Sequence, residues 1–394
     1  MRLVLAIRSS RPIPSGCGPS NLDNIARIYR TSYRCLDTSQ SDRLSRGAIT
    51  QNGRTHSLSE FINPVLVEVS RGTLVESVHR GAAAIVDHGG GLVAAWGDVE
   101  RSVFARSALK PLQALPLIES GAADAFAVSD DEIALACASH GGEPMHVDRV
   151  RGWLKRLGLG ESDLECGAHM PTHGPTANAM IRSDHEASAV HNNCSGKHAG
   201  MLATALYLRQ PTAGYIRRQH AVQRGVRETL SALCETDLSD APDGTDGCGI
   251  PVIGMSLHAT AQGMAHLANP AGLPRQRAAA AARVVRAMRR YPELVAGTDR
   301  FCTVMMRHTE AAVKTGAEGV YTAVLPNQGW GIALKIDDGA ARAAEVAMAA
   351  LLEFAGIVTK PYDTALAERM EPPVTNVANR IVGAVRAVPE LRHR

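Results

Sequence analysis

The stretch Arg106-Ser107-Ala108-Leu109-Lys110-Pro111 lies where a group of short predicted strands gives way to a mainly helical part of the chain. Side chains three residues apart share one face of a helical turn, so Ser107 and Lys110 are expected to lie side by side. An unprotonated amine can take the proton of a serine hydroxyl and make it a nucleophile. The spacing therefore predicts a Ser-Lys nucleophile, provided that neighbouring groups lower the pKa of the lysine.

The composition is that of an ordinary soluble globular protein. Of 394 residues, 45% are apolar and 21% are charged. The net charge of +3 is too small to indicate a nucleic-acid partner, and no apolar run approaches the ~18 residues of a membrane span. Eight cysteines scattered over this length do not resemble a disulfide framework. We therefore expect a cytoplasmic protein that binds neither nucleic acid nor membrane.

Residues 1–62 differ in composition from the rest of the chain. They are rich in Arg, Ser, Asn and Gln and show no sustained period of 2 or 3.6 residues. Such a segment buries too little apolar surface to order itself. The sequence predicts a poorly ordered extension over 1–62 and a single domain over 63–394.

The periodicity of the remaining chain predicts strands near both ends and helices between them. Strands are expected at 65–69, 84–87, 92–96, 319–324, 331–337 and 380–385. Helices are expected at 144–157, 196–208, 214–235, 273–290, 303–314 and 340–355, and a capping box at Ser129–Glu132 predicts one more. This order predicts an α+β fold, in which one antiparallel sheet is built from both ends of the chain around a helical insertion.

Two further residues are candidates for the chemistry at Ser107. Ser139 ends an apolar helix just before His140-Gly141-Gly142, so its hydroxyl is expected near a loop; the alternative is a turn serine bonded to the backbone. Lys335 shares one face of strand 331–337 with Gly331 and Ala333, where a ligand can approach closely. The alternative for Lys335 is a solvated strand lysine.

Two cysteines lie on polar segments. Cys194 directly precedes the helix 196–208, where the helix dipole favours a thiolate, and Cys248 lies in a turn-rich loop. With Lys197, His198 and Asp246 beside them, the two thiols suit an open Zn²⁺ site. The alternative is a pair of free, half-buried thiols.

Four motifs in this order resemble the L-asparaginase II family of the rhizobial type. They are Ala105-Arg106-Ser107-Ala108-Leu109-Lys110-Pro111-Leu112-Gln113, Cys137-Ala138-Ser139-His140, Cys194-Ser195-Gly196-Lys197-His198 and Thr245-Asp246-Gly247-Cys248. The resemblance covers residues 63–388. The chain departs from the family in two respects: Gly141 stands where a serine is often found, and residues 1–62 have no recognised counterpart.

The resemblance implies a fold like that of serine β-lactamases and glutaminases, usually as a homodimer, and hydrolysis of L-asparagine to L-aspartate and ammonia. It implies that Ser107 is the nucleophile with Lys110 as its partner, and that Ser139 and Lys335 form a second Ser-Lys pair. It also implies a zinc ion held by Cys194, Lys197 and Cys248. We expect Arg106, Asp246 and His198 to bind the substrate.

Three alternatives remain at this point. A glutaminase is close, because one methylene in the substrate changes discrimination by only ~1–3 kcal/mol. A serine acyl-transferase acting on β-lactams or D-alanyl peptides is disfavoured, since we see no Lys-Thr-Gly on a predicted terminal strand and no Ser-Asp-Asn. A zinc or thiol sensor without catalysis leaves Ser107, Lys110 and Lys335 unexplained.

Overall fold

The computed structural model of the chain describes residues 48–51, 54–57 and 62–392. The chain divides into two compact units after Glu60, and each is considered by itself. In the first unit, β1 (Ala48–Gln51) and β2 (Arg54–Ser57) pair as an antiparallel hairpin. The remainder of the predicted extension over 1–62 lies outside the described residues, apart from Ile62.

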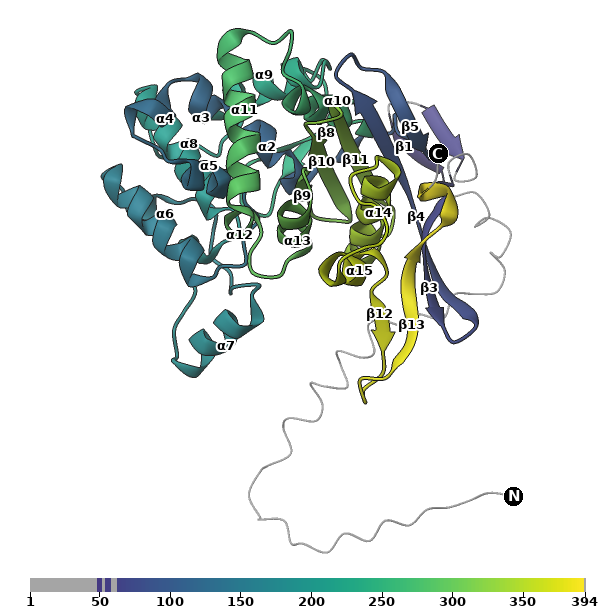
Figure 1. The fold of residues 1–394 in the computed structure, drawn as a ribbon. Coiled ribbons are helices and arrows are strands. Elements are labelled where there is room, and N and C mark those ends of the chain that lie inside the picture. Colours follow the sequence, from purple (N-terminus) through teal and green to yellow (C-terminus); the bar gives the residue numbers. More distant parts are fainter. Residues whose placement is uncertain (1–47, 52–53, 58–61, 393–394) are drawn as a thin grey trace, which may run out of the picture. The chain divides into compact units, whose positions relative to one another are not determined.

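The second unit contains an eight-stranded antiparallel sheet drawn from both ends of the chain (Figure 1). Its strand order is β12-β13-β3-β4-β11-β10-β9, and β5 also pairs with β4. The strands are β3 (Val65–Arg71), β4 (Leu74–Asp87), β5 (Leu92–Trp96), β9 (Ala312–Thr315), β10 (Val320–Leu325), β11 (Trp330–Ile336), β12 (Pro373–Thr375) and β13 (Ile381–Ala387). The prediction of an α+β fold with this sheet is confirmed.

A smaller sheet of three strands, in the order β6-β8-β7, was not predicted. Its strands are β6 (Val103–Phe104), β7 (Asp243–Thr245) and β8 (Pro251–Met255). Phe104 pairs with Gly254, and Thr245 pairs with Pro251. This pairing brings the chain just before Ser107 beside the turn that carries Cys248.

Helices fill the middle of the chain and flank the large sheet. They are α2 (Lys110–Gln113), α3 (Leu115–Glu119), α4 (Ala122–Ala125), α5 (Asp130–Ala136), α6 (Pro144–Arg156), α7 (Gly174–Arg182), α8 (Ser195–Tyr207), α9 (Ala221–Leu233), α10 (Leu257–Ala268), α11 (Arg275–Arg290), α12 (Pro292–Val295), α13 (Phe301–His308), α14 (Ala341–Phe354) and α15 (Thr364–Met370). Short 3₁₀ helices occur at η1 (Arg106–Leu109), η2 (Glu161–Asp163), η3 (Ala189–His191) and η4 (Pro389–Leu391).

The helix predictions at 144–157, 196–208, 273–290 and 340–355 are confirmed to within two residues, and the capping box opens α5 as expected. Two predictions are wrong. The segment 214–235 is helical only in α9, and 303–314 is the helix α13 followed by a separate strand, β9.

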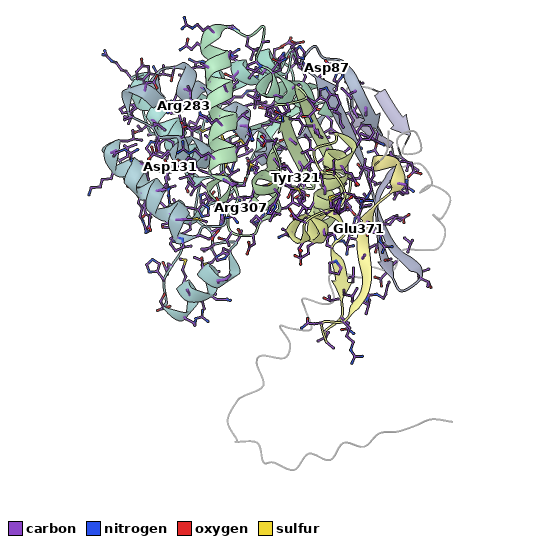
Figure 2. The ribbon with its side chains drawn as sticks, in the orientation of Figure 1. Asp87, Asp131, Arg283, Arg307, Tyr321 and Glu371 are labelled. Carbon is purple, nitrogen blue, oxygen red and sulfur yellow. The ribbon has the colours of Figure 1, made fainter. Side chains whose placement is uncertain are left out.

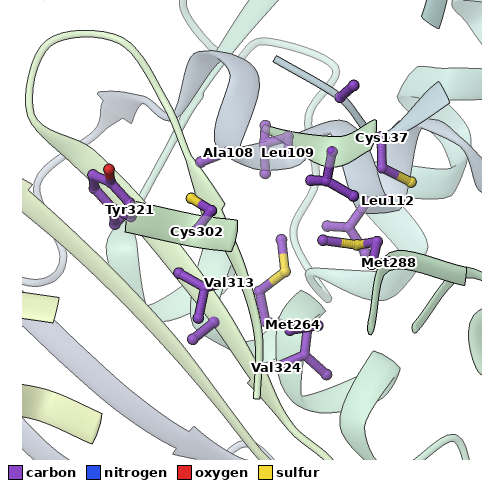
Figure 3. Packing of buried hydrophobic residues seen from close by; sticks show 14 of the residues in the cluster. Ala108, Leu109, Leu112, Cys137, Met264, Met288, Cys302, Val313, Tyr321 and Val324 are labelled. Atoms are coloured by element: carbon purple, nitrogen blue, oxygen red, sulfur yellow. The ribbon is translucent and has the colours of Figure 1, made fainter. Parts of the chain in front are cut away.

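Helix α10 covers the face of the sheet that carries Ala84 and Ala333, where Leu257 and Ala261 pack. A larger core lies between the sheet and the helical part, and Figure 3 shows Leu112, Met264, Met288 and Val324 within it. Truncating a fully buried member such as Leu112 to alanine is expected to cost about 2–5 kcal/mol. This core places η1 and α2, and hence Ser107, against the sheet.

Charged side chains lie mainly on the outside of the described unit (Figure 2). Arg283 of α11, for example, forms ion pairs of 3.4 Å with Asp124 and 3.1 Å with Asp130.

Within the residues that the structure describes, no helix combines the length and the apolar composition needed to traverse a bilayer.

Candidate active site

Ser107 and Lys110 belong to a tight helical turn. The backbone N–H of Lys110 donates to the carbonyl of Ser107, which closes the 3₁₀ turn η1 where α2 begins. In 3₁₀ geometry residues i and i+3 lie directly above one another, so the two side chains share a face. Ser107 is half-buried and Lys110 is 0% exposed. Within the described residues the Ser107 hydroxyl has no hydrogen-bond partner, which leaves it available to a substrate.

The large sheet fixes the position of η1. The hydroxyl of Thr322 on β10 donates to the carbonyl of Ala108 at 3.0 Å. Gly316, directly after β9, lies so close to the chain before Ser107 that a Cβ atom on it would be 2.6 Å from the Ala105 carbonyl oxygen. Only glycine permits this approach. The stretch around Ser107 is therefore held against the edge of the sheet formed by β9 and β10.

Ser139 bridges two buried lysines. Lys110 Nζ donates to Ser139 Oγ at 3.1 Å, and Lys314 Nζ lies 2.8 Å from the same oxygen. Lys110 also donates to the carbonyl of Ala138, and Lys314 donates to that of Thr315 at 2.7 Å. The backbone N–H of Ser139 donates to Val295 at 2.9 Å. The result is a continuous chain of polar groups that leads from the Ser107 turn to β9.

The two amines differ in their surroundings. Burial, and then the nearby charge of Lys110, lowers the pKa of Lys314 from its usual value to about 7. The side chain is 1% exposed, so water does not solvate its charged form. Near neutral pH a substantial fraction of Lys314 is therefore uncharged and able to accept a proton.

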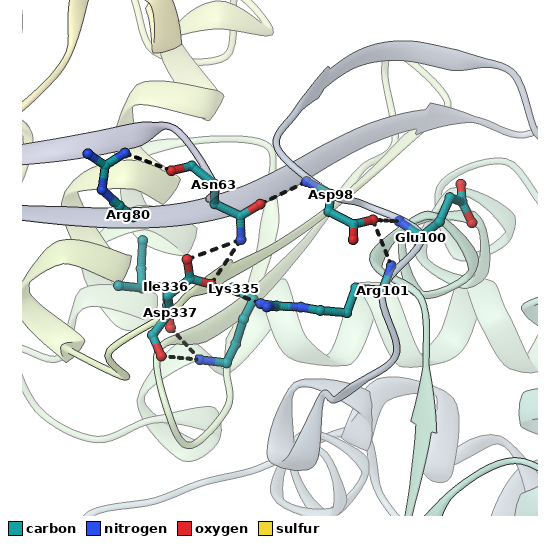
Figure 4. A network of polar contacts seen from close by, with 8 residues as sticks. All are labelled: Asn63, Arg80, Asp98, Glu100, Arg101, Lys335, Ile336 and Asp337. Atoms are coloured by element: carbon teal, nitrogen blue, oxygen red, sulfur yellow. Dashed lines mark hydrogen bonds and ion pairs between the residues drawn. The ribbon is translucent and has the colours of Figure 1, made fainter. Parts of the chain in front are cut away.

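The prediction that Lys335 pairs with Ser139 is wrong. Lys335 Nζ donates to the carbonyls of Ile336 and Asp337, the second at 3.5 Å (Figure 4). Lys314 is aligned through Thr322 with Ala333, so Lys335 lies two strands away and two residues further along the sheet. With strands ~4.8 Å apart, the two lysines are separated by about 10 Å or more.

Asp337 ties the Lys335 segment into a different network. Its carboxylate accepts from Asn63 at 2.9 and 3.1 Å and from Arg101 at 2.9 Å. Figure 4 shows these groups around the start of the second unit. Lys335 thus lies beside a polar network that Asp337 forms with Asn63 and Arg101.

Lys314 was missed because its strand gives little signal in the sequence. β9 has four residues, three of them buried, so it lacks the alternation of a half-buried strand. The sequence predicted a helix up to residue 314, whereas α13 ends at His308. The available signal was the triplet Lys314-Thr315-Gly316, a Lys-Thr-Gly that begins at the last residue of this predicted helix.

The structure brings the three predicted metal ligands together. Lys197 Nζ donates to Cys248 Sγ at 3.0 Å, and the Cys248 thiol is in hydrogen-bond contact with Cys194. This contact, supported by the charges of Lys110 and Lys197, holds the pKa of Cys194 well below its usual range. Burial alone would lower the pKa of Lys197, but the neighbouring thiols raise it on balance.

These three residues suit a soft divalent metal. Two sulfurs and one nitrogen are ligands that Zn²⁺ accepts, and a site with three protein ligands leaves a position for water or substrate. Among the described residues, no group of three or more His, Cys, Asp or Glu side chains is placed to hold a metal. A zinc site here therefore depends on the amine of Lys197 as its third ligand.

The predicted substrate-binding residues have different environments. Arg106 Nε donates to Asp246 Oδ1 at 2.6 Å, so these two bind each other. His198 is 0% exposed, and its Nδ1 lies 2.6 Å from the Tyr215 hydroxyl. Burial lowers the pKa of His198 well below its usual value. In this structure His198 is packed inside the protein and has no open face toward a substrate.

One positioning group was not predicted. The buried carboxylate of Glu143 accepts from the Thr298 backbone N–H at 2.9 Å and from the Thr298 hydroxyl at 2.5 Å. It therefore fixes the loop that follows Val295, whose carbonyl binds Ser139. The only signal for Glu143 in the sequence was its position before Pro144 at a helix start.

Taken as chemistry, the site has an unpaired serine hydroxyl, a route for its proton and a nearby group of thiols. A serine hydroxyl beside a buried amine is suited to attack a carbonyl carbon. The second serine and second lysine extend the proton route into the sheet. The arrangement suits acyl transfer from an amide.

Comparison with known proteins adds a family. Residues 67–387 match the sequence model of the family described as L-asparaginase II. No curated protein matches the chain. Solved structures similar to it include a β-lactamase from Mycobacterium bovis, at 14% identity over 67% of this chain and 89% of that chain, with a TM-score of 0.36. Mglu in its native form is 17% identical over 72% of this chain and 67% of that chain, with a TM-score of 0.37.

Proposed function

Because the chain belongs to the L-asparaginase II family, we propose that it hydrolyses L-asparagine to L-aspartate and ammonia with Ser107 as the nucleophile. The observation that supports this most directly is the Ser139 hydroxyl between two buried amines, 3.1 Å from Lys110 and 2.8 Å from Lys314. Family membership supports an amidohydrolase, and the choice of asparagine and of this mechanism is our proposal.

In the proposed reaction, Ser107 Oγ attacks the side-chain amide carbon of asparagine. Its proton passes to Lys110, and from there through Ser139 toward Lys314. The C–N bond then breaks, the nitrogen takes a proton from the same route, and ammonia leaves. An aspartyl ester on Ser107 remains, and water hydrolyses it with the same groups acting in reverse.

The pair of lysines makes this route workable near neutral pH. Burial, and then the charge of Lys110, lowers the pKa of Lys314 to about 7. Lys314 is therefore able to accept a proton relayed through Lys110 and Ser139, which leaves positive charge on this pair of lysines. The positive charge also favours the oxyanion that forms during attack.

The proposal includes one zinc ion held by Cys194, Lys197 and Cys248. The contact between the two thiols and the Lys197–Cys248 distance of 3.0 Å support this donor set. When bound, zinc would supply a fixed positive charge able to orient a carboxylate or carbonyl of the substrate. Lys197 and Cys248 must lose protons to bind it, so affinity should fall at low pH.

The family resemblance also supports a homodimer, which light scattering on the purified protein tests, and the scattered cysteines support a cytoplasmic location. A β-lactam acyl-transferase is the second candidate function. One observation favours it: Lys314 and Thr315 end the edge strand β9 and Gly316 directly follows it, which gives a Lys-Thr-Gly that none of the predicted strands contains.

One assay separates these functions. Purified protein is tested for ammonia release from L-asparagine and L-glutamine, and for opening of a chromogenic cephalosporin. We expect ammonia from asparagine and its loss in Ser107→Ala. Ser183→Ala is the matched control, since that hydroxyl only bonds Ala179 and Met180 at the end of α7. Ammonia release that persists in Ser107→Ala refutes the nucleophile, and a preference for glutamine or the cephalosporin refutes the substrate.

A further inference from the structure

Arg106, the residue before the nucleophile, has an unusual backbone. Its φ is 53°, in the left-handed region that residues with a side chain rarely adopt. Such conformations persist only where the surroundings enforce them, and they occur often at functional sites. The preceding Ala105 is right-handed, with φ −70° and ψ −12°. The chain therefore changes direction at Arg106, immediately before Ser107.

The chain is held on both sides of this reversal. On one side, the close approach of Gly316 fixes the Ala105 carbonyl, and on the other, Thr322 binds the carbonyl of Ala108. Arg106 and Ser107 are the residues between these two anchors. The backbone of Arg106 consequently decides in which direction the Ser107 side chain points.

The side chain of Arg106 has a rigid partner. Arg106 Nε donates to Asp246 Oδ1 at 2.6 Å, and the Asp246 side chain is only 8% exposed. The Gly247 N–H donates to the same carboxylate oxygen at 2.8 Å. The pair is thus a short, charge-assisted contact, which is stronger than a neutral hydrogen bond.

The small sheet sets the distance between the two partners. β6 leads into Arg106, β7 leads into Asp246, and both strands pair with β8. Asp246 is therefore at a fixed position relative to the start of η1. An aspartate held in this way can retain a neighbouring residue in a conformation that it would otherwise leave.

We propose that Arg106 and Asp246 are positioning residues, in which the ion pair holds Arg106 in the left-handed conformation and thereby aims the Ser107 hydroxyl. This inference rests on the proposed function of Ser107 and deepens it. It is an alternative to the expectation that the Arg106 guanidinium binds the substrate directly, since the Nε of that group donates to Asp246.

Glycine and alanine at position 106 separate the two roles. Both remove the guanidinium, but glycine adopts a positive φ freely, whereas alanine resists it. A substrate-binding arginine would lose the same function in both variants. A positioning arginine would lose more in alanine than in glycine, by about tenfold for a left-handed alanine.

The test measures Ser107 reactivity with and without asparagine. In the first arm, phenylmethanesulfonyl fluoride is added and the intact mass is followed: the serine oxygen bonds to sulfur, and fluoride leaves with the serine proton taken up by a base. In the second arm, kcat and KM for asparagine are measured. We expect Arg106→Ala to lower both the labelling rate and kcat about tenfold with little change in KM. Arg106→Gly should recover most of that loss.

Asp246→Asn supplies the second half of the test. It should lower the labelling rate in the wild-type background but add little to Arg106→Gly, because the carboxylate acts through Arg106. Zinc content and thermal melting are measured alongside, so that metal loss or misfolding is recognised. Arg218→Ala is the matched control, since it breaks the exposed 2.5 Å pair with Asp243 on the same hairpin and should leave both rates within about twofold.

Two results overturn the inference. Equal labelling rates in wild type, Arg106→Ala and Arg106→Gly, with KM raised in both variants, would make Arg106 a substrate-binding residue. Equal kcat losses in Arg106→Ala and Arg106→Gly would show that the left-handed backbone conformation at position 106 does not determine turnover. A wild-type protein that neither hydrolyses asparagine nor is labelled at Ser107 instead refutes the proposed function, which is a separate outcome.

Discussion

Replacing Lys314 by methionine tests the revised active site most directly. Methionine has a similar length and packs in the same buried space, but it has no amine. It would remove the contacts of 2.8 Å to Ser139 Oγ and 2.7 Å to the Thr315 carbonyl. Loss of a positioned acid-base group typically lowers turnover 10²–10⁴-fold, so we expect kcat/KM for asparagine to fall by about that factor.

The pKa of Lys314 adds a pH signature to this prediction. Because burial lowers the pKa to about 7, wild-type kcat/KM should rise as pH increases through 7 and level off above it. Lys314→Met should lose this rise. The matched control is Lys335→Met, which removes an amine from the same sheet face without touching Ser139 and should keep the profile and most of the activity.

Although Lys314→Met should lower activity, it should raise the stability of the folded protein. The pKa of Lys314 is about 7 in the folded protein and 10.5 for an unperturbed lysine, so the unfolded state binds more protons between these values. The free energy of unfolding of the wild-type protein therefore rises with pH between about 7 and 10.5. Below pH 7 the buried amine destabilises the protein to its full extent. The difference between the two pKa values corresponds to roughly 5 kcal/mol of unfolding free energy at most. Lys314→Met should raise the melting temperature at pH 6, by an amount that shrinks toward pH 10.

Steady-state kinetics from pH 5.5 to 9.5 and differential scanning calorimetry over the same range provide both readouts. The reasoning fails if Lys314→Met keeps wild-type kcat/KM, or if Lys335→Met is the more damaging of the two. If the difference in melting temperature between Lys314→Met and wild type instead grows with pH, the low pKa of Lys314 is contradicted, even if the activity falls as expected.

Three further predictions concern the zinc site, the first unit and the loop beside Ser139. Chelation, or Cys248→Ala, should remove one zinc per chain by metal analysis and raise KM more than it lowers kcat; absence of zinc together with unchanged kinetics excludes the site. Deleting residues 1–60 should leave melting and activity nearly unchanged, because the family match begins at residue 67; a large fall in melting temperature would reveal a docked element. Glu143→Gln should lower stability by about 1–3 kcal/mol, since it weakens two bonds to Thr298, and an unchanged denaturation midpoint would contradict this.

The architecture was predictable because its longer elements carry clear periodic signals. The strands β3, β5, β10, β11 and β13 and the helices α6, α8, α11 and α14 all have a counterpart in the sequence analysis. The order of strands and helices then sufficed for the α+β class. The small sheet was not predictable in this way, because β6 has two residues and β7 has three.

The residues of the candidate site could be predicted where they belong to a short contiguous motif. They were harder to predict where their place depends on how distant segments pair. The Ser107 turn, Ser139 and the two cysteines could each be recognised from neighbouring residues. Lys314 required knowledge of which strand forms the edge beside η1, and that depends on pairing across the sheet. The strand that carries Lys335 has a more regular sequence pattern than the strand that carries Lys314. Such a pattern predicts a well-formed strand, but it does not predict how far that strand lies from Ser139.

The burial of two lysines around one serine is itself an argument that the site is used. Lys110 is 0% and Lys314 is 1% exposed, and within the described part of the chain neither forms an ion pair with a carboxylate. Burying amines without opposite charges costs stability, and a hydrophobic side chain would fill the same space at less cost. Here the carbonyls of Ala138 and Thr315 and the hydroxyl of Ser139 satisfy the two amines while leaving one of them easy to deprotonate. A structural role is served poorly by this arrangement, whereas the proton transfer to and from Ser107 that we propose makes use of it.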